Sequence, residues 1–282
     1  MEAQHDMIRL PTIFSAPNMP VDIPKLFSGF KKRRREPDEW DKTIVAISPY
    51  QLKDLALPEH QKTEGSRDEE IEQQTFKIRL AHSRERVSSA SMLVQRKYTS
   101  RGYQATGFEK TPERITLMAF QEDKVIGTLT LGLDSPKGLL VEDLYKQEID
   151  SLRQAGRKIC ELTKLAVDQT HGSKHVLASL FHISYIYGRV MQGYTDVVIE
   201  VNPRHVKFYK RMLGFVELGS ERMCSRVNAP AVLLRLELDY VDQQIKLLGG
   251  KADSLKGERS LYPYFFAKMD EVGITQRLER GE

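Results

Sequence analysis

The sequence is organised around TDVVIEVNPRHVKFYKRMLGF, which occupies residues 195–215. Residues 195–201 are dense in β-branched side chains, which favour a strand buried inside a sheet. A helix can start directly afterwards, because Asn202 is a good N-cap and Pro203 suits the first helical position. Gly214 is placed to end that helix. The stretch therefore predicts a buried strand followed by an α-helix, as in an α/β domain.

Hydrophobic periodicity extends this pattern in both directions along the chain. The polar pair Glu122-Asp123 separates two strand-like runs and predicts a hairpin. We expect strands at residues 76–81, 114–121, 124–133, 158–167, 195–201, 216–222 and 231–238, and helices at 84–98, 141–155, 175–191 and 203–213. This order of elements predicts a mixed α/β domain.

Composition divides the chain into three parts. Residues 1–70 hold seven of the twelve prolines and have charges in blocks, so we expect a mostly extended, irregular segment with at most a short helix near 49–57. Residues 71–248 hold the regular pattern and form the predicted domain. Residues 249–282 are a C-terminal extension, in which 261–272 can form an amphipathic helix packed on the domain.

Charge, hydropathy and cysteine content exclude several classes of protein. A formal net charge of +4 over 282 residues gives no argument for nucleic-acid binding, which needs a concentrated basic surface. The basic run at residues 31–35 is expected to be a solvated tail, with contact to an anionic membrane or an acidic carrier protein left open. No apolar run has the ~18 residues that a membrane-spanning helix needs, and the first residues show no secretory signal. With only Cys160 and Cys224, we expect a reduced cytoplasmic protein, peripheral contact with the inner membrane being the open alternative.

The segment QTHGSK at residues 169–174 lies between a predicted strand and the start of a predicted helix. Free N–H groups and the helix dipole attract an anion there, Gly172 permits close approach, and Lys174 adds a positive charge. These residues indicate a phosphate or pyrophosphate site. An ordinary strand-to-helix turn explains them equally well when the loop is taken alone.

Two motifs together resemble those of the GNAT acyltransferases. The loop fits the pyrophosphate motif Q/R-x-x-G-x-G/A from Gln169 and departs from it only where Lys174 replaces the final small residue. The segment FYKRMLGF at residues 208–215 is similar to the common FYxKLGF signature. The resemblance implies a GNAT fold, in which helices flank a mixed, mostly antiparallel central sheet.

A narrower resemblance points to one branch of that superfamily. CELTKLAVD at residues 160–168, the loop after it and the stretch up to Phe215 resemble the N-acyl amino acid synthases of the FeeM type, relatives of the acyl-homoserine-lactone synthases. The similarity covers about residues 72–240. It implies transfer of a long-chain fatty acyl group from an acyl carrier protein thioester to the amino group of an amino acid. An acyl-phosphopantetheine donor, on a carrier protein or on coenzyme A, is implied, and no tightly bound cofactor.

The resemblance also assigns site residues. A strand with Glu-x-(Ser/Thr)-(Arg/Lys) lines the acyl site in these families, which corresponds to Glu161, Thr163 and Lys164. The lactone synthases generally carry Arg where this chain has Lys164, which argues against S-adenosylmethionine as a substrate. The predicted acyl- and pantetheine-binding residues are Leu165, Ala166, Val167, Gln169, Gly172, Ser173, Lys174 and Asn202.

Amide formation from a thioester needs a deprotonated amine, a polarised carbonyl and a protonated leaving sulfur. Glu161 is the predicted base, and the open alternative is that it only pairs with Lys164. Tyr209 is the predicted proton donor to sulfur, and the open alternative is a core tyrosine. Backbone N–H groups of residues 165–167 could bind the carbonyl oxygen if the strand bulges there.

Two other functions stay open at this point: an acetyl-CoA-dependent acetyltransferase, and a non-catalytic GNAT-fold domain that binds a partner or a membrane. A metal site is not expected. His171, His175 and His182 share a helical spacing, but no carboxylate joins them at a metalloprotease spacing.

Overall fold

The computed structural model describes residues 45–47, 76–81, 84–104, 108, 111–168, 174–255 and 257–280. All of these residues belong to one compact unit, Pro37–Glu282, and Met1–Glu36 are a unit of their own. The short helix predicted near residues 49–57 lies outside the described residues.

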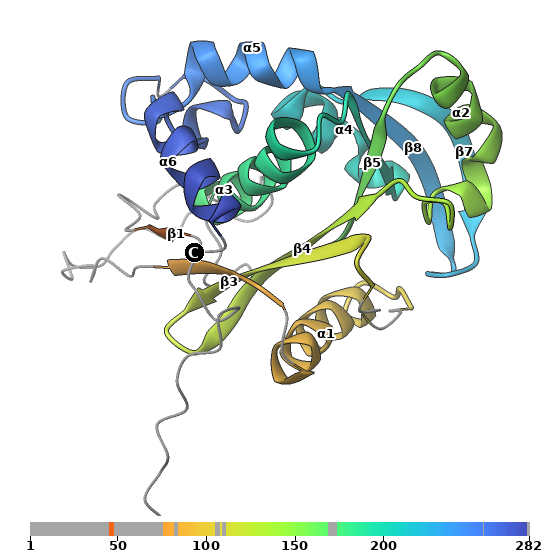
Figure 1. The fold of residues 1–282 in the computed structure, drawn as a ribbon. Coiled ribbons are helices and arrows are strands. Elements are labelled where there is room, and N and C mark those ends of the chain that lie inside the picture. Colours follow the sequence, from red (N-terminus) through yellow and green to blue (C-terminus); the bar gives the residue numbers. More distant parts are fainter. Residues whose placement is uncertain are drawn as a thin grey trace, which may run out of the picture. The chain divides into compact units, whose positions relative to one another are not determined.

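An eight-stranded sheet forms the centre of the described unit (Figure 1). Its strands, in spatial order, are β1 (Val45–Ile47), β2 (Phe76–Leu80), β3 (Arg114–Gln121), β4 (Lys124–Leu133), β5 (Ile159–Val167), β6 (Asp196–Val201), β8 (Ala229–Glu237) and β7 (Val216–Cys224). All neighbouring strands run antiparallel except β5 and β6, which run parallel. The mixed, mostly antiparallel sheet and its seven predicted strands are confirmed. The sequence analysis did not predict β1, which pairs with β2 at the edge of the sheet.

Two groups of helices cover the two faces of this sheet (Figure 1). The helices are α1 (Arg84–Thr99), α2 (Glu142–Gln154), α3 (Lys174–Tyr185), the π-helix η2 (Ile186–Met191), α4 (Pro203–Leu213), α5 (Leu238–Leu248), the 3-10 helix η3 (Tyr262–Tyr264) and α6 (Lys268–Glu279). Side chains of α1 pack on Ala166 of β5, and those of α2 pack on Ile159 of the same strand. The larger core cluster lies on the other face, where α3 to α6 meet the sheet.

The helix predicted after the buried strand is confirmed at both ends. The Asn202 side chain accepts a hydrogen bond from the N–H of Arg204 (3.2 Å), and Pro203 occupies the first turn. Gly214 ends α4 with a φ of 82°, a left-handed conformation that glycine adopts without strain. The helix predicted at 175–191 changes into η2 in its second half.

The predicted helix at residues 261–272 is wrong. Residues 262–264 form a 3-10 turn, and α6 begins only at Lys268. The backbone is extended at Phe265 (ψ 157°) and at Ala267 (ψ 157°), so the helix does not continue from the 3-10 turn into α6. The sequence analysis also missed α5, which follows β8 without a loop.

The C-terminal extension completes the larger core. Leu261, Tyr262, Phe265 and Ile274 are all buried, at 3% exposure or less. The Tyr262 hydroxyl donates to the carbonyl oxygen of Leu213 (2.6 Å), and the Leu261 N–H donates to that of Met212 (2.9 Å). These bonds tie the extension to the end of α4.

A buried hydrogen bond between His182 and Glu271 also joins the extension to α3. His182 Nδ1 accepts from the N–H of Phe266 (2.9 Å), so Nε2 carries the proton that faces Glu271 Oε2 at 3.1 Å. The rings of Phe265, Phe266 and Tyr185 lie around the imidazole, and Lys268 contacts the other oxygen of Glu271. Burial lowers the pKa of His182 although Glu271 opposes it. Burial alone would raise the pKa of Glu271, but hydrogen bonds from His182 and Lys268 outweigh it and lower that pKa.

Acid is therefore expected to destabilise the docked extension. Both groups hold protons less strongly in the folded protein than in the unfolded chain, so the free energy of unfolding falls as pH drops from about 7 towards 4. Thermal melts across this pH range measure the effect. A His182→Gln variant should show a lower Tm at pH 7 and a flatter pH dependence, since its amide does not titrate. A variant with the wild-type slope would contradict this reading.

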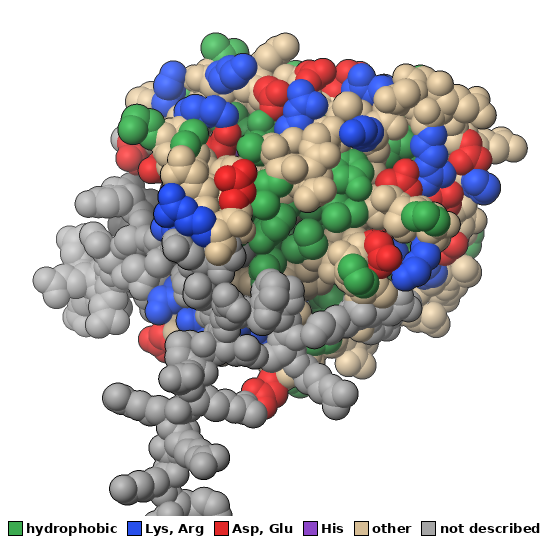
Figure 2. Space-filling model, viewed as in Figure 1, with side chains coloured by type: hydrophobic (Ala, Val, Ile, Leu, Met, Phe, Trp, Pro, Cys, Tyr) green, Lys and Arg blue, Asp and Glu red, His purple; other side chains and the backbone are tan. Residues whose placement is uncertain are grey.

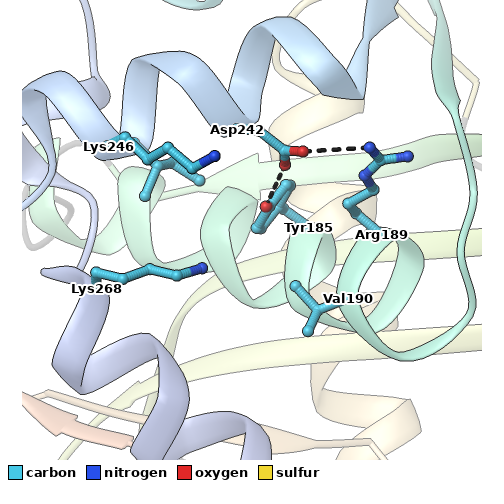
Figure 3. Close-up of a pocket in the computed structure, with 7 residues that line it drawn as sticks. Tyr185, Arg189, Val190, Asp242, Lys246 and Lys268 are labelled. Atoms are coloured by element: carbon cyan, nitrogen blue, oxygen red, sulfur yellow. Dashed lines mark hydrogen bonds and ion pairs between the residues drawn. The ribbon is translucent and has the colours of Figure 1, made fainter.

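Charged side chains surround a central group of hydrophobic ones on the face seen in Figure 2. A separate pocket of about 190 Å³ lies between η2, α5 and α6. There Tyr185 and Arg189 both bind Asp242, while Lys246 and Lys268 extend from α5 and α6 (Figure 3). None of the predicted site residues lines this pocket.

Candidate active site

The two parallel strands at the centre of the sheet separate along their length. The register pairs β5 with β6 only from Ile159–Asp196 to Glu161–Val198 in the described chain. Beyond these pairs, the described residues provide β5 with a neighbouring strand only on the side of β4. The N–H groups of β5 that point away from β4 are therefore available to a ligand between the strands.

A bulge in β5 lies directly after this point of separation. Pairing with β4 moves from Thr130–Thr163 to Thr128–Ala166, so Lys164 and Leu165 together oppose Leu129. Lys164 has a φ of 52°, which is strained for a residue with a side chain. The Thr128 hydroxyl donates to its carbonyl oxygen at 3.0 Å. The predicted binding of the carbonyl oxygen by N–H groups of residues 165–167 requires a bulge in the strand, and this bulge is present. Bulges of this kind are common beside active sites.

A row of polar side chains crosses the face of the sheet that α1 and α2 cover. Thr116 and Thr130 share a hydrogen bond of 2.8 Å, and Thr163 lies opposite Thr130 on β5. The Thr163 hydroxyl is buried, and no hydrogen-bond partner for it occurs in the described part of the chain. A buried hydroxyl without a protein partner can form its hydrogen bond with a substrate.

Glu161 lies at one end of this row and is 0% exposed. Its carboxylate accepts hydrogen bonds from the N–H groups of Leu140 (3.0 Å) and Val141 (3.1 Å) and from Arg114 (3.2 Å). Burial raises the pKa of Glu161, and these three donors oppose that rise. A Cβ at Gly132 would lie 2.7 Å from Glu161 Cγ, so the carboxylate fills the space that this glycine leaves.

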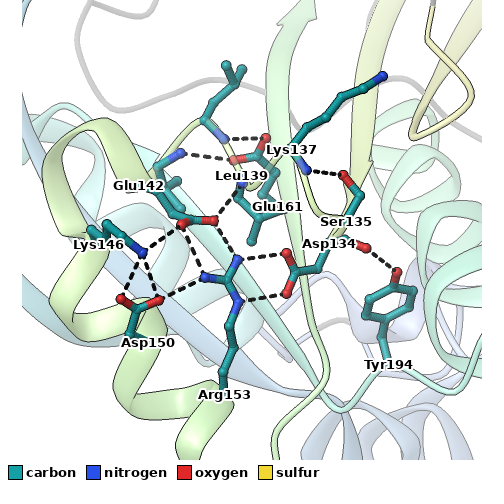
Figure 4. A network of polar contacts seen from close by, with 12 residues as sticks. Asp134, Ser135, Lys137, Leu139, Glu142, Lys146, Asp150, Arg153, Glu161 and Tyr194 are labelled. Carbon is teal, nitrogen blue, oxygen red and sulfur yellow. Dashed lines mark hydrogen bonds and ion pairs between the residues drawn. The ribbon is translucent and has the colours of Figure 1, made fainter.

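The contacts of Glu161 place it in a network that fixes the start of α2 (Figure 4). Within the same network, Arg153 bridges Asp134 and Glu142, and Glu142 accepts from the N–H of Leu139 at 2.7 Å. The alternative, in which Glu161 pairs with Lys164, does not occur: the Lys164 ammonium lies over the Phe108 ring (4.6 Å). This geometry favours a positioning role for Glu161 over the predicted role as base.

Tyr209 lies on α4, the helix that follows β6, and packs against the larger core. Its ring makes edge contacts with Phe208 (5.3 Å) and Phe215 (5.8 Å). Burial raises the pKa of Tyr209 strongly, and Arg101 opposes the rise. The phenol is therefore protonated at neutral pH, as the predicted proton donor must be.

The remaining predicted residues fall into three groups. Gln169, Gly172 and Ser173 lie outside the described residues. Lys174 begins α3 with its ammonium over the Tyr264 ring (5.4 Å), and Asn202 caps α4 while its Nδ2 donates to the Pro230 carbonyl (3.1 Å). Leu165 packs on the larger core, Ala166 packs near α1, and Val167 pairs with Gly127 of β4.

The sequence analysis missed the residue that anchors the strand before the loop. Asp168 is buried and contacts Arg96 (3.3 Å), Lys97 (3.2 Å) and Lys124 (3.8 Å). It joins the last turn of α1 to the end of β5. An aspartate at the end of an apolar strand was a visible signal, but its three partners are distant in sequence.

The described residues contain no group of three His, Cys, Asp or Glu side chains placed to bind a metal ion. No helix in the same part of the chain is both long enough and apolar enough to span a membrane.

Comparison with protein families identifies the chain. A sequence model described as N-acyl amino acid synthase FeeM matches residues 89–237. The chain belongs to the FeeM family. The match runs from within α1 to the end of β8, so the FeeM-family part includes the β5 bulge and Tyr209. As a family member, the protein is an acyltransferase with a GNAT-like fold.

The chain is also similar to solved structures. The structure of FeeM from uncultured soil microbes is 27% identical with a TM-score of 0.54, covering 58% of this chain and 90% of that one. An acyl-CoA N-acyltransferase from Pseudomonas aeruginosa is 13% identical with a TM-score of 0.41, covering 57% and 97%. The AHL synthase LasI is also 13% identical, with a TM-score of 0.42 and coverage of 58% and 91%. A comparison with curated proteins finds no match.

Proposed function

We propose that this protein transfers a long-chain fatty acyl group from an acyl carrier protein thioester to the amino group of an amino acid. The observation that carries the proposal is the bulge of β5 at the point where β5 and β6 separate. Membership of the FeeM family supports an amino acid as acceptor. The free cysteines Cys160 and Cys224 suit a reducing cytoplasm.

The site offers each element of the chemistry. The acceptor loses a proton from its ammonium group to water, and the free amine attacks the thioester carbonyl. N–H groups of residues 165–167 hold the oxygen of the tetrahedral intermediate as the C–N bond forms. The C–S bond then breaks, the sulfur takes the phenolic proton of Tyr209, and the nitrogen releases its second proton. Solvent restores the Tyr209 proton.

Basic residues on α4 support a carrier protein as donor. A groove along α4 and β7 is lined by Lys207, Lys210 and Arg211 and by two acidic residues, of which Glu217 pairs with Lys210 at 2.9 Å. Lys174 begins the helix after the predicted phosphate loop. Carrier proteins are acidic, so these charges would steer their association.

A direct assay tests the proposal. The purified protein is incubated with acyl carrier protein or coenzyme A thioesters, each carrying acetyl or long-chain acyl groups, and with a panel of amino acids. We expect mass spectrometry to detect N-acyl amino acids from the long-chain carrier thioesters, with rates that fall as salt rises. Turnover with acetyl-CoA alone would overturn the proposal. Comparable rates with long-chain acyl-CoA at all salt concentrations would overturn the carrier protein as donor.

A further inference from the structure

The pocket of about 190 Å³ between η2, α5 and α6 is large enough to hold a small molecule. One water molecule takes up about 30 Å³, so a ligand of several non-hydrogen atoms fits. Three of the lining residues, Asp242, Lys246 and Lys268, come after residue 237, where the FeeM match ends. The pocket is therefore built in part from the C-terminal portion of the chain that the match does not cover.

One wall of this pocket is fixed by hydrogen bonds. The two oxygens of Asp242 accept from the Tyr185 hydroxyl and from Arg189 (3.2 Å), as Figure 3 shows. The same guanidinium group also contacts Asp239 and donates to the Tyr194 carbonyl (3.3 Å). Asp242 is the only carboxylate among the described residues that line the pocket, and Arg189 balances its charge.

Two lysines extend into the pocket, Lys246 from α5 and Lys268 from α6 (Figure 3). In the described part of the chain, no carboxylate lies within ion-pair distance of Lys246. Lys268 contacts one oxygen of Glu271, whose other oxygen faces His182. An ammonium group has three N–H donors, so both lysines keep donors for a ligand.

The charges that line the pocket indicate the chemistry of this ligand. Two ammonium groups remain after Asp242 and Arg189 balance each other, and an anion between them offsets their repulsion. Ammonium groups bind phosphate as point charges, whereas a carboxylate is matched best by the planar fork of an arginine. The fork of Arg189 is already bound to Asp242. Val190 and Ile245 add an apolar side, which suits the carbon part of an organic phosphate.

We propose that Lys246 and Lys268 bind the phosphate group of an organic phosphate in this pocket. The inference does not depend on acyl transfer, because none of the residues predicted for that reaction lines the pocket. A bound phosphate joins α5 to α6, and so holds the C-terminal extension that supplies part of the larger core. Binding should therefore stabilise the folded protein.

Thermal melts and isothermal titration calorimetry with glycerol phosphate, at fixed ionic strength, test for a soluble ligand. We expect the wild type to bind it and to show a Tm that rises with its concentration. Lys246→Gln should weaken binding by about 10-fold or more, since it removes a charge-assisted hydrogen bond. Lys251→Gln is the matched control, because this lysine donates to the Leu247 carbonyl (2.7 Å) and does not line the pocket.

Sedimentation with lipid vesicles distinguishes a lipid headgroup from a soluble phosphate. In phosphatidylglycerol no choline cation balances the phosphate, so vesicles of this lipid are compared with phosphatidylcholine vesicles. Binding of the wild type but not of Lys246→Gln to the anionic vesicles assigns the phosphate to a lipid, and binding of glycerol phosphate alone assigns it to a soluble ligand. A wild type that binds neither overturns the inference. A Lys246→Gln/Lys268→Gln double variant that binds as strongly as the wild type overturns it too, because the phosphate then binds elsewhere. The acylation assay tests the proposed function separately.

Discussion

Deletion of residues 249–282 is expected to abolish the cooperative thermal unfolding of the protein. The extension places four large apolar side chains in the core: Leu261, Tyr262, Phe265 and Ile274. Burial of each contributes about 1.5–3 kcal/mol, and a whole domain is stable by only about 5–15 kcal/mol. Loss of all four therefore removes an amount comparable with the entire free energy of unfolding. Circular dichroism melts measure the transition.

Deletion of residues 1–36 is the matched control, because it removes a similar length of chain from the separate N-terminal unit. We expect this control to keep its transition. The cut preserves β1, which a deletion up to residue 70 would remove. Ile274→Ala gives a graded version of the test and should lower the free energy of unfolding by about 2–5 kcal/mol. A truncated protein that melts like the wild type would show that the extension is not part of the core.

Tyr209→Phe is expected to slow acyl transfer by about 10²–10⁴-fold, the usual contribution of a general acid. The substitution removes only the hydroxyl and keeps the ring contacts with Phe208 and Phe215. The defect should shrink when the leaving thiol is more acidic, since such a thiolate departs without a proton. Single-turnover rates with acyl-pantetheine analogues of different thiol acidity measure this. A defect that is the same for every leaving group rules out the proton-donor role.

The variant Glu161→Gln distinguishes a catalytic base at this position from a residue that only positions its neighbours. A positioning residue predicts a lower Tm and a rate loss that is equal at pH 7 and pH 9, because Gln cannot accept from Leu140, Val141 and Arg114 as a carboxylate does. Recovery of the rate at high pH, where more of the acceptor amine is already free, would instead support the base predicted from the sequence.

Local chemistry explains which parts of the fold could be predicted. Asn202, Pro203 and Gly214 act on their own backbone neighbours, so both ends of α4 followed from the sequence. Contacts between residues that are distant in the sequence could not be predicted in this way. Glu161 is bound by groups 20 to 47 positions away, and only folding brings them together.

The same distinction applies to the error in the fold. Apolar residues near 261–272 correctly indicated packing on the domain, but the extended backbone at Phe265 and Ala267 delays the helix until Lys268.

The buried C-terminal extension has a consequence for synthesis on the ribosome. At 5–20 residues per second, residues 249–282 take roughly 2–7 s to add after α5 has been made. During that time the larger core lacks Tyr262 and Phe265, and the apolar side of α3 and α4 that they cover has no partner. The nascent chain therefore passes through an aggregation-prone stage that lasts until residues 261–274 have been made, and binding by a chaperone during that stage would protect it.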